Sequence, residues 1–332
     1  MKILRPVAGL LTAAALASIA VQAAPVTALA FSPDGTELLI GRGSTVNIHK
    51  LPGGNLRDKM ALSISRVTDL KFSPHGNLLA IAGGLSGSKG EVRLLTWPDR
   101  KYAGSVAGFE DLATAVAFHP KGGQLAVASA DRSISIHAVA GGQVSGMPVY
   151  RLVKHSRAVL DVAYDRDGRY LVTASSDRSL KVWESATGKP IRSLGNHTEI
   201  VNALSMRPPV RFGDQVLPFY CASASDDRTV RIWQPGIGRM VRIVRYHDSE
   251  VNTVVWHPQG DRLYSADRAG MVRVIDAESD RILGKWPAHD DWIYRLVINR
   301  SGDLLATGDW TGRVRIWSER DGKAEMVREI VP

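Results

Sequence analysis

The sequence contains a single cysteine, Cys221, among 332 residues. One thiol cannot form an internal disulfide, a Cys-x-x-Cys redox pair or a thiolate zinc site, so we expect Cys221 to be a small buried apolar residue. A phosphate-binding loop is also missing. The glycine-rich segment 83–90, GGLSGSKG, lacks the strand, the Lys-Ser/Thr pair and the helix that such a loop requires. The chemistry of phosphate-loop nucleotide hydrolysis is thereby excluded.

Clustered metal ligands and long basic runs are absent as well. The nine histidines are spread along the chain without the close spacing of ligand pairs, so we expect neither a metal nor another cofactor. The net charge of +9 could attract nucleic acid, acidic glycans or a membrane surface. Because no run of basic residues forms a patch, we interpret Lys and Arg as solvated residues and expect no nucleic-acid partner.

The N-terminal region has the layout of a secretory signal peptide. Lys2 and Arg5 are followed by the apolar, alanine-rich run 7–20, and Val21 and Ala23 supply small residues for cleavage before residue 24. An uncleaved membrane anchor is the alternative, but the run is short and weakly hydrophobic for a span. We therefore predict a signal peptide over 1–23 and an exported protein, periplasmic or extracellular, without stable membrane insertion after cleavage.

A repeating unit is clearest in residues 155–197, which start at one histidine and end at the next. Asp165 and Gly168 favour a turn between the first two apolar runs. Pro190 lacks a backbone donor and suits the start of an edge strand. Strands are predicted at 159–164, 170–175, 180–184 and 190–194. Such a small four-stranded sheet leaves both faces exposed, so it needs neighbours to cover it.

The same unit occurs seven times. The apolar triplet of its first strand, Val159/Val162/Tyr164, reappears as Val26/Leu29/Phe31, Val67/Leu70/Phe72, Ala113/Val116/Phe118, Val201/Leu204/Met206, Val251/Val254/Trp256 and Ile293/Leu296/Ile298. The third-strand pair Val182-Trp183 recurs in step with it, for example as Ile232-Trp233 and Ile316-Trp317. A four-strand unit with a period of roughly 40–45 residues is typical of a propeller blade.

At these residues the chain resembles the WD40-repeat β-propellers. FSPDG (31–35) and FSPHG (72–76) carry the resemblance at the first turn, and SDRSLKVW (176–183) and DDRTVRIW (226–233) carry it at the third strand. The resemblance implies an all-β, seven-bladed propeller with four antiparallel strands per blade. We expect one propeller domain over 24–332, with blades at about 26–62, 67–106, 113–153, 159–195, 201–246, 251–286 and 292–330.

The phase of the repeats gives each blade its own four strands. We therefore predict that the ring closes by packing of blade 7 against blade 1, without exchange of the strand at 24–30. Blade 5 carries an insert, 207–219, at the end of the ring opposite the loops between blades. It is apolar enough for a second docking site, or it lies as a hairpin against its own blade.

Blades 4 and 5 contain His, Ser or Thr, Asp and Trp in an order that could suggest a hydrolase triad. The resemblance instead implies a hydrogen-bonded tetrad that ties a loop to a strand, and its recurrence argues for architecture because an active site is normally unique. The hydroxyl is Thr173 or Ser175 in blade 4 and Ser223 or Ser225 in blade 5. We assign the structural tetrads as His155, Ser175, Asp177 and Trp183, and as His197, Ser225, Asp227 and Trp233. Ala269 and Thr311 stand at the Asp position in blades 6 and 7.

We predict no catalytic residues and a non-enzymatic, monomeric scaffold that binds a partner protein or peptide. The loops between blades collect large aromatic and charged residues, and exposed aromatics are typical interface anchors. The predicted partner-binding residues are Trp292, Tyr294, Asp309, Trp310, Arg132, Arg178 and Arg228. Trp292 and Trp310 could instead cover the seam between blades, and the arginines could be plain solvated turn residues.

Two other functions remain open from sequence. One is an enzymatic or small-ligand site in the central channel, for which Asp161, Asn202 and Asn252 are the candidates on first strands. The other is binding of an anionic glycan or lipid through the three turn arginines. Such binding would weaken as salt is added.

Overall fold

The structure is a computed structural model of the chain, and it describes residues 23–209, 211–212, 215–216 and 219–332. The predicted signal peptide, 1–23, lies outside the described residues except for Ala23. Within the described ranges there is no helix long and apolar enough to cross a membrane.

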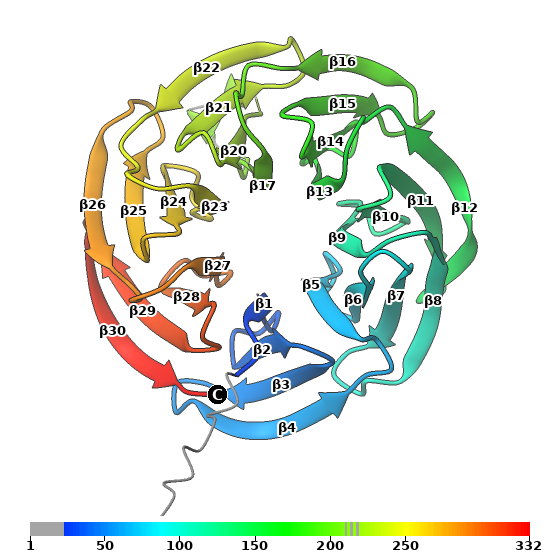
Figure 1. Cartoon of the computed structure of the whole chain (residues 1–332), viewed down its shortest axis with the longest axis horizontal. Coiled ribbons are helices and arrows are strands. Elements are labelled where there is room, and N and C mark those ends of the chain that lie inside the picture. Colours follow the sequence, from blue (N-terminus) through cyan, green and yellow to red (C-terminus); the bar gives the residue numbers. More distant parts are fainter. Residues whose placement is uncertain (1–22, 210, 213–214, 217–218) are drawn as a thin grey trace, which may run out of the picture.

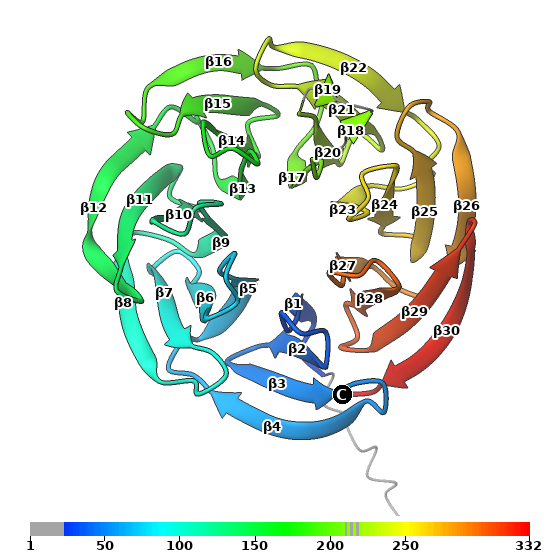
Figure 2. The same cartoon turned by 180° about the vertical axis from the view of Figure 1, so that it is seen from behind.

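Seven antiparallel sheets stand around a central channel like the blades of a propeller (Figures 1 and 2). Each has four strands, so the predicted all-β fold is confirmed. Blade 1 consists of β1 (Val26–Phe31), β2 (Glu37–Arg42), β3 (Thr45–Lys50) and β4 (Asn55–Ala61). Blade 2 consists of β5 (Arg66–Phe72), β6 (Leu78–Leu85), β7 (Lys89–Thr96) and β8 (Tyr102–Phe109). Blade 3 consists of β9 (Ala113–Phe118), β10 (Gln124–Ser129), β11 (Ser133–Ala140) and β12 (Gln143–Val153).

The remaining blades repeat this order. Blade 4 consists of β13 (Val159–Tyr164), β14 (Tyr170–Ser175), β15 (Leu180–Glu184) and β16 (Pro190–Leu194). Blade 5 consists of β17 (Val201–Met206), β20 (Cys221–Ser225), β21 (Val230–Gln234) and β22 (Arg239–Val244). Blade 6 consists of β23 (Val251–Trp256), β24 (Arg262–Asp267), β25 (Met271–Asp276) and β26 (Ile282–Pro287). Blade 7 consists of β27 (Ile293–Ile298), β28 (Leu304–Asp309), β29 (Val314–Arg320) and β30 (Lys323–Ile330).

The core lies between neighbouring blades. Val172 and Val182 of blade 4 pack with Val201 and Leu204 of blade 5, and equivalent clusters occur around the ring. Cys221 is fully buried in this same cluster, as predicted, and burial raises the pKa of its thiol. Each sheet therefore covers its faces with its two neighbours, which explains why a single blade could not exclude water alone.

The ring closes without strand exchange, as the repeat phase predicts. β1 pairs with β2 in blade 1, and blade 7 takes all four of its strands from the C-terminal segment. Val26 and Leu29 of blade 1 share an apolar cluster with Ala306 and Ile316 of blade 7. Closure therefore depends on side-chain packing between these two blades.

Every first strand contains a β-bulge near its start. In β13 the register shifts between Val159 and Asp161, so Leu160 has no partner in β14. The other six blades shift at the same place. A bulge bends the strand and re-aims the side chain of the extra residue. The bulged residues are Thr27, Thr68, Thr114, Leu160, Asn202, Asn252 and Tyr294.

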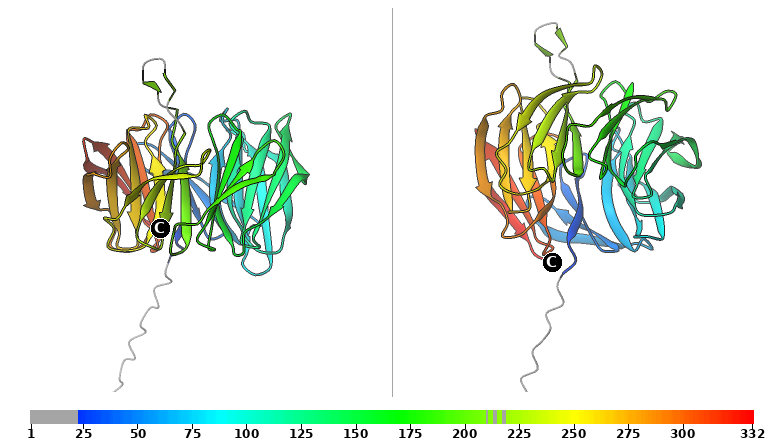
Figure 3. Two further views of the ribbon diagram at one scale, coloured as in Figure 1. Left: turned by 90° about the horizontal axis from the view of Figure 1, so that it is seen from above. Right: turned by 45° about the horizontal axis from the view of Figure 1, so that its top comes forward.

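The insert of blade 5 forms a separate two-stranded hairpin. Its strands β18 (Arg211–Phe212) and β19 (Gln215–Val216) pair with each other and stand away from the ring (Figure 3). The hairpin is thus not laid against its own blade. Where the insert returns to the ring, Phe219 stacks on Tyr170 of blade 4 at 5.5 Å between ring centroids.

Candidate functional site

The predicted hydrogen-bond chain is present in blade 4, but through Thr173. The Thr173 Oγ1 lies 2.8 Å from His155 Nε2 and accepts a hydrogen bond from Trp183 Nε1 at 3.1 Å. The other ring nitrogen, His155 Nδ1, lies 2.8 Å from the Asp177 carboxylate. The chain runs from indole to hydroxyl to imidazole to carboxylate, which requires a neutral histidine with its proton on Nδ1.

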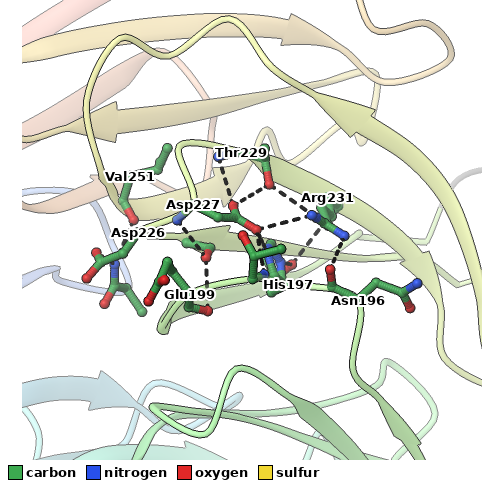
Figure 4. Close-up of polar contacts among 12 residues, drawn as sticks. Asn196, His197, Glu199, Asp226, Asp227, Thr229, Arg231 and Val251 are labelled. Atoms are coloured by element: carbon green, nitrogen blue, oxygen red, sulfur yellow. Dashed lines mark hydrogen bonds and ion pairs between the residues drawn. The ribbon is translucent and has the colours of Figure 1, made fainter.

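Blade 5 repeats the chain with Ser223 as the hydroxyl. Figure 4 shows His197 beside Asp227, and its Nδ1 lies 2.7 Å from the carboxylate. Ser223 Oγ lies 2.7 Å from His197 Nε2 and accepts from Trp233 Nε1 at 2.8 Å. Arg231 forms an ion pair with Asp227, at 3.1 Å.

Ser175 and Ser225 therefore do not occupy the tetrad position that the sequence assigns to them. Ser175 donates to the carbonyl of Ala158 at 2.8 Å, and its oxygen accepts from the Asp177 N–H. Ser225 does the same in its own loop. Thr173 and Ser175 are two residues apart and therefore share a face of their strand, as do Ser223 and Ser225. Only Thr173 and Ser223 lie close enough to the tryptophan of the next strand to accept its N–H.

Blades 6 and 7 also contain the histidine–carboxylate pair, two residues earlier than the sequence comparison places it. Asp267 and Asp309 pair with the first strand of their blades where Ser175 does in blade 4. Their carboxylates lie 2.8 Å from the Nδ1 atoms of His247 and His289. Ala269 and Thr311, which the alignment of repeats puts at the Asp position, are not part of the pair.

Asp309 is consequently a correction to the predicted partner-binding set. Only 2% of it is exposed, and with His289, Thr307 and Trp317 it forms the complete chain of blade 7. A buried carboxylate that already accepts from its histidine is not available to a partner. Its neighbour Trp310 is exposed and remains in the set.

The electrostatics of the tetrads fit a structural role. Burial lowers the pKa of His197 and His247, which favours their neutral form. Burial alone would raise the pKa of Asp227, but the hydrogen bond from His197 holds it well below its usual value. The hydroxyls of Thr173 and Ser223 are fully buried, so no substrate carbonyl can reach them. A hydrolase needs an accessible nucleophile, and the hydroxyls of these tetrads do not supply one.

The accessible polar site lies at the mouth of the channel, on the side of the loops between blades. All seven bulged residues line one cavity of about 260 Å³ there. Several of them link neighbouring blades. Thr27 donates to the carbonyl of Val67 at 2.5 Å, and Asn202 donates to that of Val251 at 2.9 Å. The hydroxyls of Thr68 and Thr114 and the amide of Asn252 make equivalent bonds to the next blade.

Three aromatic side chains of blade 7 gather at this mouth. Tyr294 stacks on Trp310 with ring centroids 5.4 Å apart, and Trp292 lies 6.0 Å from Trp310. The two tryptophans remain 42% and 38% exposed, so they do not simply seal the seam between blades. The sequence brings Trp292, Tyr294 and Trp310 to one end of the ring, and the structure places them in contact.

Three arginines that sequence reasoning missed complete the mouth. Arg66, Arg268 and Arg295 come from blades 2, 6 and 7 and line the same cavity. One of them could have been found by comparing the repeats. Arg268 follows Asp267 as Trp310 follows Asp309, so Arg268 and Trp310 occupy the same place in the loops of blades 6 and 7.

Arg132, Arg178 and Arg228 are exposed in turns, with left-handed backbone φ of 76°, 71° and 63°. None of the three lines the mouth cavity. Arg228 instead borders a separate hollow with Arg231 and Arg245.

Asp161 lies deeper in the channel than the two asparagines with which the sequence groups it. It lines a second cavity of about 220 Å³ with Asp69, Lys71 and Arg295. Its carboxylate accepts the backbone N–H of Leu204 at 2.7 Å, and burial raises its pKa. Asp161 thus joins blade 4 to blade 5. Among the described residues, no group of three or more His, Cys, Asp or Glu is arranged to hold a metal ion.

The closed ring of four-stranded blades and the repeated tetrads define a β-propeller with an accessible cavity at the mouth of its channel. Comparisons with known proteins agree. The WD domain, G-beta repeat model matches residues 103–137, 146–184, 188–234 and 280–318, and the WD40 domain model of anaphase-promoting complex subunit 4 matches 222–298. The protein belongs to the WD40-repeat family, whose members generally act as protein-interaction scaffolds.

Its curated relatives are distant. It is 27% identical over 136 residues to COMPASS component SWD3 of Saccharomyces cerevisiae, covering 41% of this chain and 40% of the relative. It is 28% identical over 189 residues to the nuclear distribution protein nudF of Aspergillus niger, covering 55% of this chain and 41% of the relative. An uncharacterized WD repeat-containing protein of Synechocystis is 29% identical over 136 residues, covering 40% and 35%. The chain thus matches about two fifths of the length of these relatives.

Proposed function

We propose that this protein is an exported, non-catalytic scaffold that binds a partner protein or peptide at the mouth of its channel. The observation that supports this most is the group formed by Trp292, Tyr294 and Trp310, which is partly exposed beside a polar cavity. Aromatic residues in such a setting are common energetic centres of interfaces. The rigid ring holds them in place, so little ordering cost accompanies binding.

The two other functions considered from sequence are less well supported. The turn arginines 132, 178 and 228 share no cavity that an anionic glycan or lipid headgroup would fill. In the channel, Asp161, Asn202 and Asn252 already bond to neighbouring blades. We also propose that the protein acts as a monomer and binds no nucleic acid.

Crosslinking in intact cells followed by mass spectrometry tests the docking face. Trp292→Ala and Trp310→Ala should each reduce the crosslinked partner by at least about tenfold, because truncation of an interface hot spot costs about 2 kcal/mol or more. Tyr102→Ala is the matched control, since Tyr102 is 64% exposed on an outer strand. If both tryptophan variants retain the crosslinks of the natural protein, the docking face is wrong.

Export has its own measurement. The intact mass and N-terminal sequence of the protein recovered from the cell envelope or medium should show cleavage before Ala24. Recovery only from the cytoplasm, with residues 1–23 still attached, would contradict the proposal of export. Either result leaves the docking face to be judged by the crosslinks.

A further inference from the structure

The wall of the mouth cavity is strongly cationic. Arg66, Arg268 and Arg295 line it, whereas its polar remainder consists of threonine hydroxyls, asparagine amides and the Tyr294 phenol. No carboxylate belongs to this lining among the described residues. A cavity lined by charges of one sign focuses their field and attracts ions of the opposite sign, here anions.

The three guanidinium groups differ in how far the protein itself occupies them. Arg295 donates to the carbonyls of Thr27 and Thr68, both at 2.9 Å. The carboxylates of Asp69 and Asp161 line the deeper cavity and form no ion pair with Arg295 within the described residues. Arg268 forms an ion pair with Asp226 at 2.8 Å. Arg66 is exposed and has no ion pair or side-chain hydrogen bond within the described part of the chain. Arg66 therefore has donors free for a ligand.

The Tyr294 phenol lies where these charges meet. Burial raises its pKa, and the three arginines act against this rise. Asp291 also acts on the phenol, in the same direction as burial. The phenolic hydroxyl is thus a neutral donor within the reach of three cations. A hydroxyl and guanidinium groups together are donors suited to a carboxylate.

The aromatic rim extends the site away from the cavity. The guanidinium of Arg268 stacks over Trp292 at 4.9 Å from the ring centroid, so the cationic cavity and the aromatic rim are in direct contact. The exposed parts of Trp292 and Trp310 lie next to the cavity and can cover an apolar side chain adjacent to the anion. A ligand therefore needs one negative group for the cavity and an apolar neighbour for the rim.

We infer that the mouth recognises an acidic peptide segment, with an Asp or Glu carboxylate in the arginine-lined cavity and an apolar residue on the tryptophan rim. This inference rests on the proposed docking function and adds the chemistry of the partner. A carboxylate suits the site better than a phosphate dianion because Arg268 and Arg295 each already use two donors within the protein.

Selection from a random heptapeptide library displayed on phage tests the assignment with the full-length protein. The C-terminus of each peptide is fused to the coat protein, so only side chains supply carboxylates. The natural protein should enrich Asp or Glu next to an aromatic or aliphatic residue. Arg66→Glu should lose this enrichment, since it replaces the free guanidinium at the mouth with a carboxylate that repels an acidic peptide.

Arg300→Glu is the matched control. Arg300 is exposed in the turn between β27 and β28, at the opposite end of the ring, and its substitution changes net charge equally. It should keep the acidic enrichment. A synthetic copy of the selected peptide, acetylated and amidated, should bind at least about tenfold more weakly when its acidic residue becomes Gln or Asn.

The outcomes separate this inference from the docking function. Selected peptides that are neutral or basic, an unaffected Gln or Asn peptide, or tighter binding of a phosphoserine version would overturn the carboxylate assignment. Equal selection by Arg66→Glu and the natural protein, or no enrichment at all, would overturn it as well. If crosslinks still depend on Trp292 and Trp310 in these cases, the docking face stands. If those crosslinks are also independent of the tryptophans, both proposals fail.

Discussion

Loss of the Ser223 hydroxyl should cost more stability than loss of the Ser265 hydroxyl, although both substitutions change serine to alanine. Both hydroxyls are fully buried and contact the Nε2 atom of a histidine, at 2.7 Å and 2.8 Å. Ser223 also accepts from the Trp233 indole. Blade 6 has Ile275 at the tryptophan position, so Ser265 has no such donor to satisfy. The two sites differ by one buried N–H.

The expected magnitude follows from the number of groups left without a partner. A buried polar group that loses its hydrogen bond costs about 1–3 kcal/mol. Ser265→Ala leaves the His247 Nε2 unpaired and should cost about that amount. Ser223→Ala leaves both His197 Nε2 and Trp233 Nε1 unpaired, so it should cost about 1–3 kcal/mol more than Ser265→Ala.

Urea unfolding followed by circular dichroism measures both costs, and a double-mutant cycle isolates the indole. In a Trp233→Phe background the indole N–H is already gone, so Ser223→Ala should then cost about as much as Ser265→Ala. Equal costs of the two alanine substitutions in the natural background would refute the assignment of Ser223 as the tetrad hydroxyl. So would a Ser223→Ala cost that Trp233→Phe does not reduce.

Two further predictions concern pH and backbone space. Because burial lowers the pKa of His197 and His247, the unfolded chain binds the extra protons, and the free energy of unfolding should fall as the pH drops below about 6.5. The lowered pKa of Asp227 adds a second loss below about pH 4. Constant stability from neutral pH to about pH 4 would contradict the histidine step, and no further fall below about pH 4 would contradict the Asp227 step. Gly270→Ala should destabilise the fold far more than Gly35→Ala. Both glycines have positive φ, 76° and 73°, but a Cβ on Gly270 would lie 1.9 Å from a backbone carbonyl oxygen, whereas one on Gly35 meets nothing within 4 Å. Equal melting temperatures of these two variants would exclude the clash.

The candidate site was only partly predictable. The aromatic residues were found because Trp292, Tyr294 and Trp310 lie in or next to the loops at one end of blade 7. Asp309 was misplaced because an exposed loop and a buried strand end look alike when only the residue type is known. Arg66 and Arg268 were missed because nothing in their local sequence indicates that two distant blades share one cavity.

The sequence by itself determined the blade number, the strands and the closure of the ring. Alternating apolar residues and turn residues are local signals, and seven repetitions in phase leave no strand to exchange. Only the tertiary structure decided between Thr173 and Ser175, because both lie on one face of β14 and the neighbouring strand selects the inner one. It also decided which residues line the channel mouth. Each blade contributes one bulged residue, and these seven side chains line one cavity only because the blades form a circle.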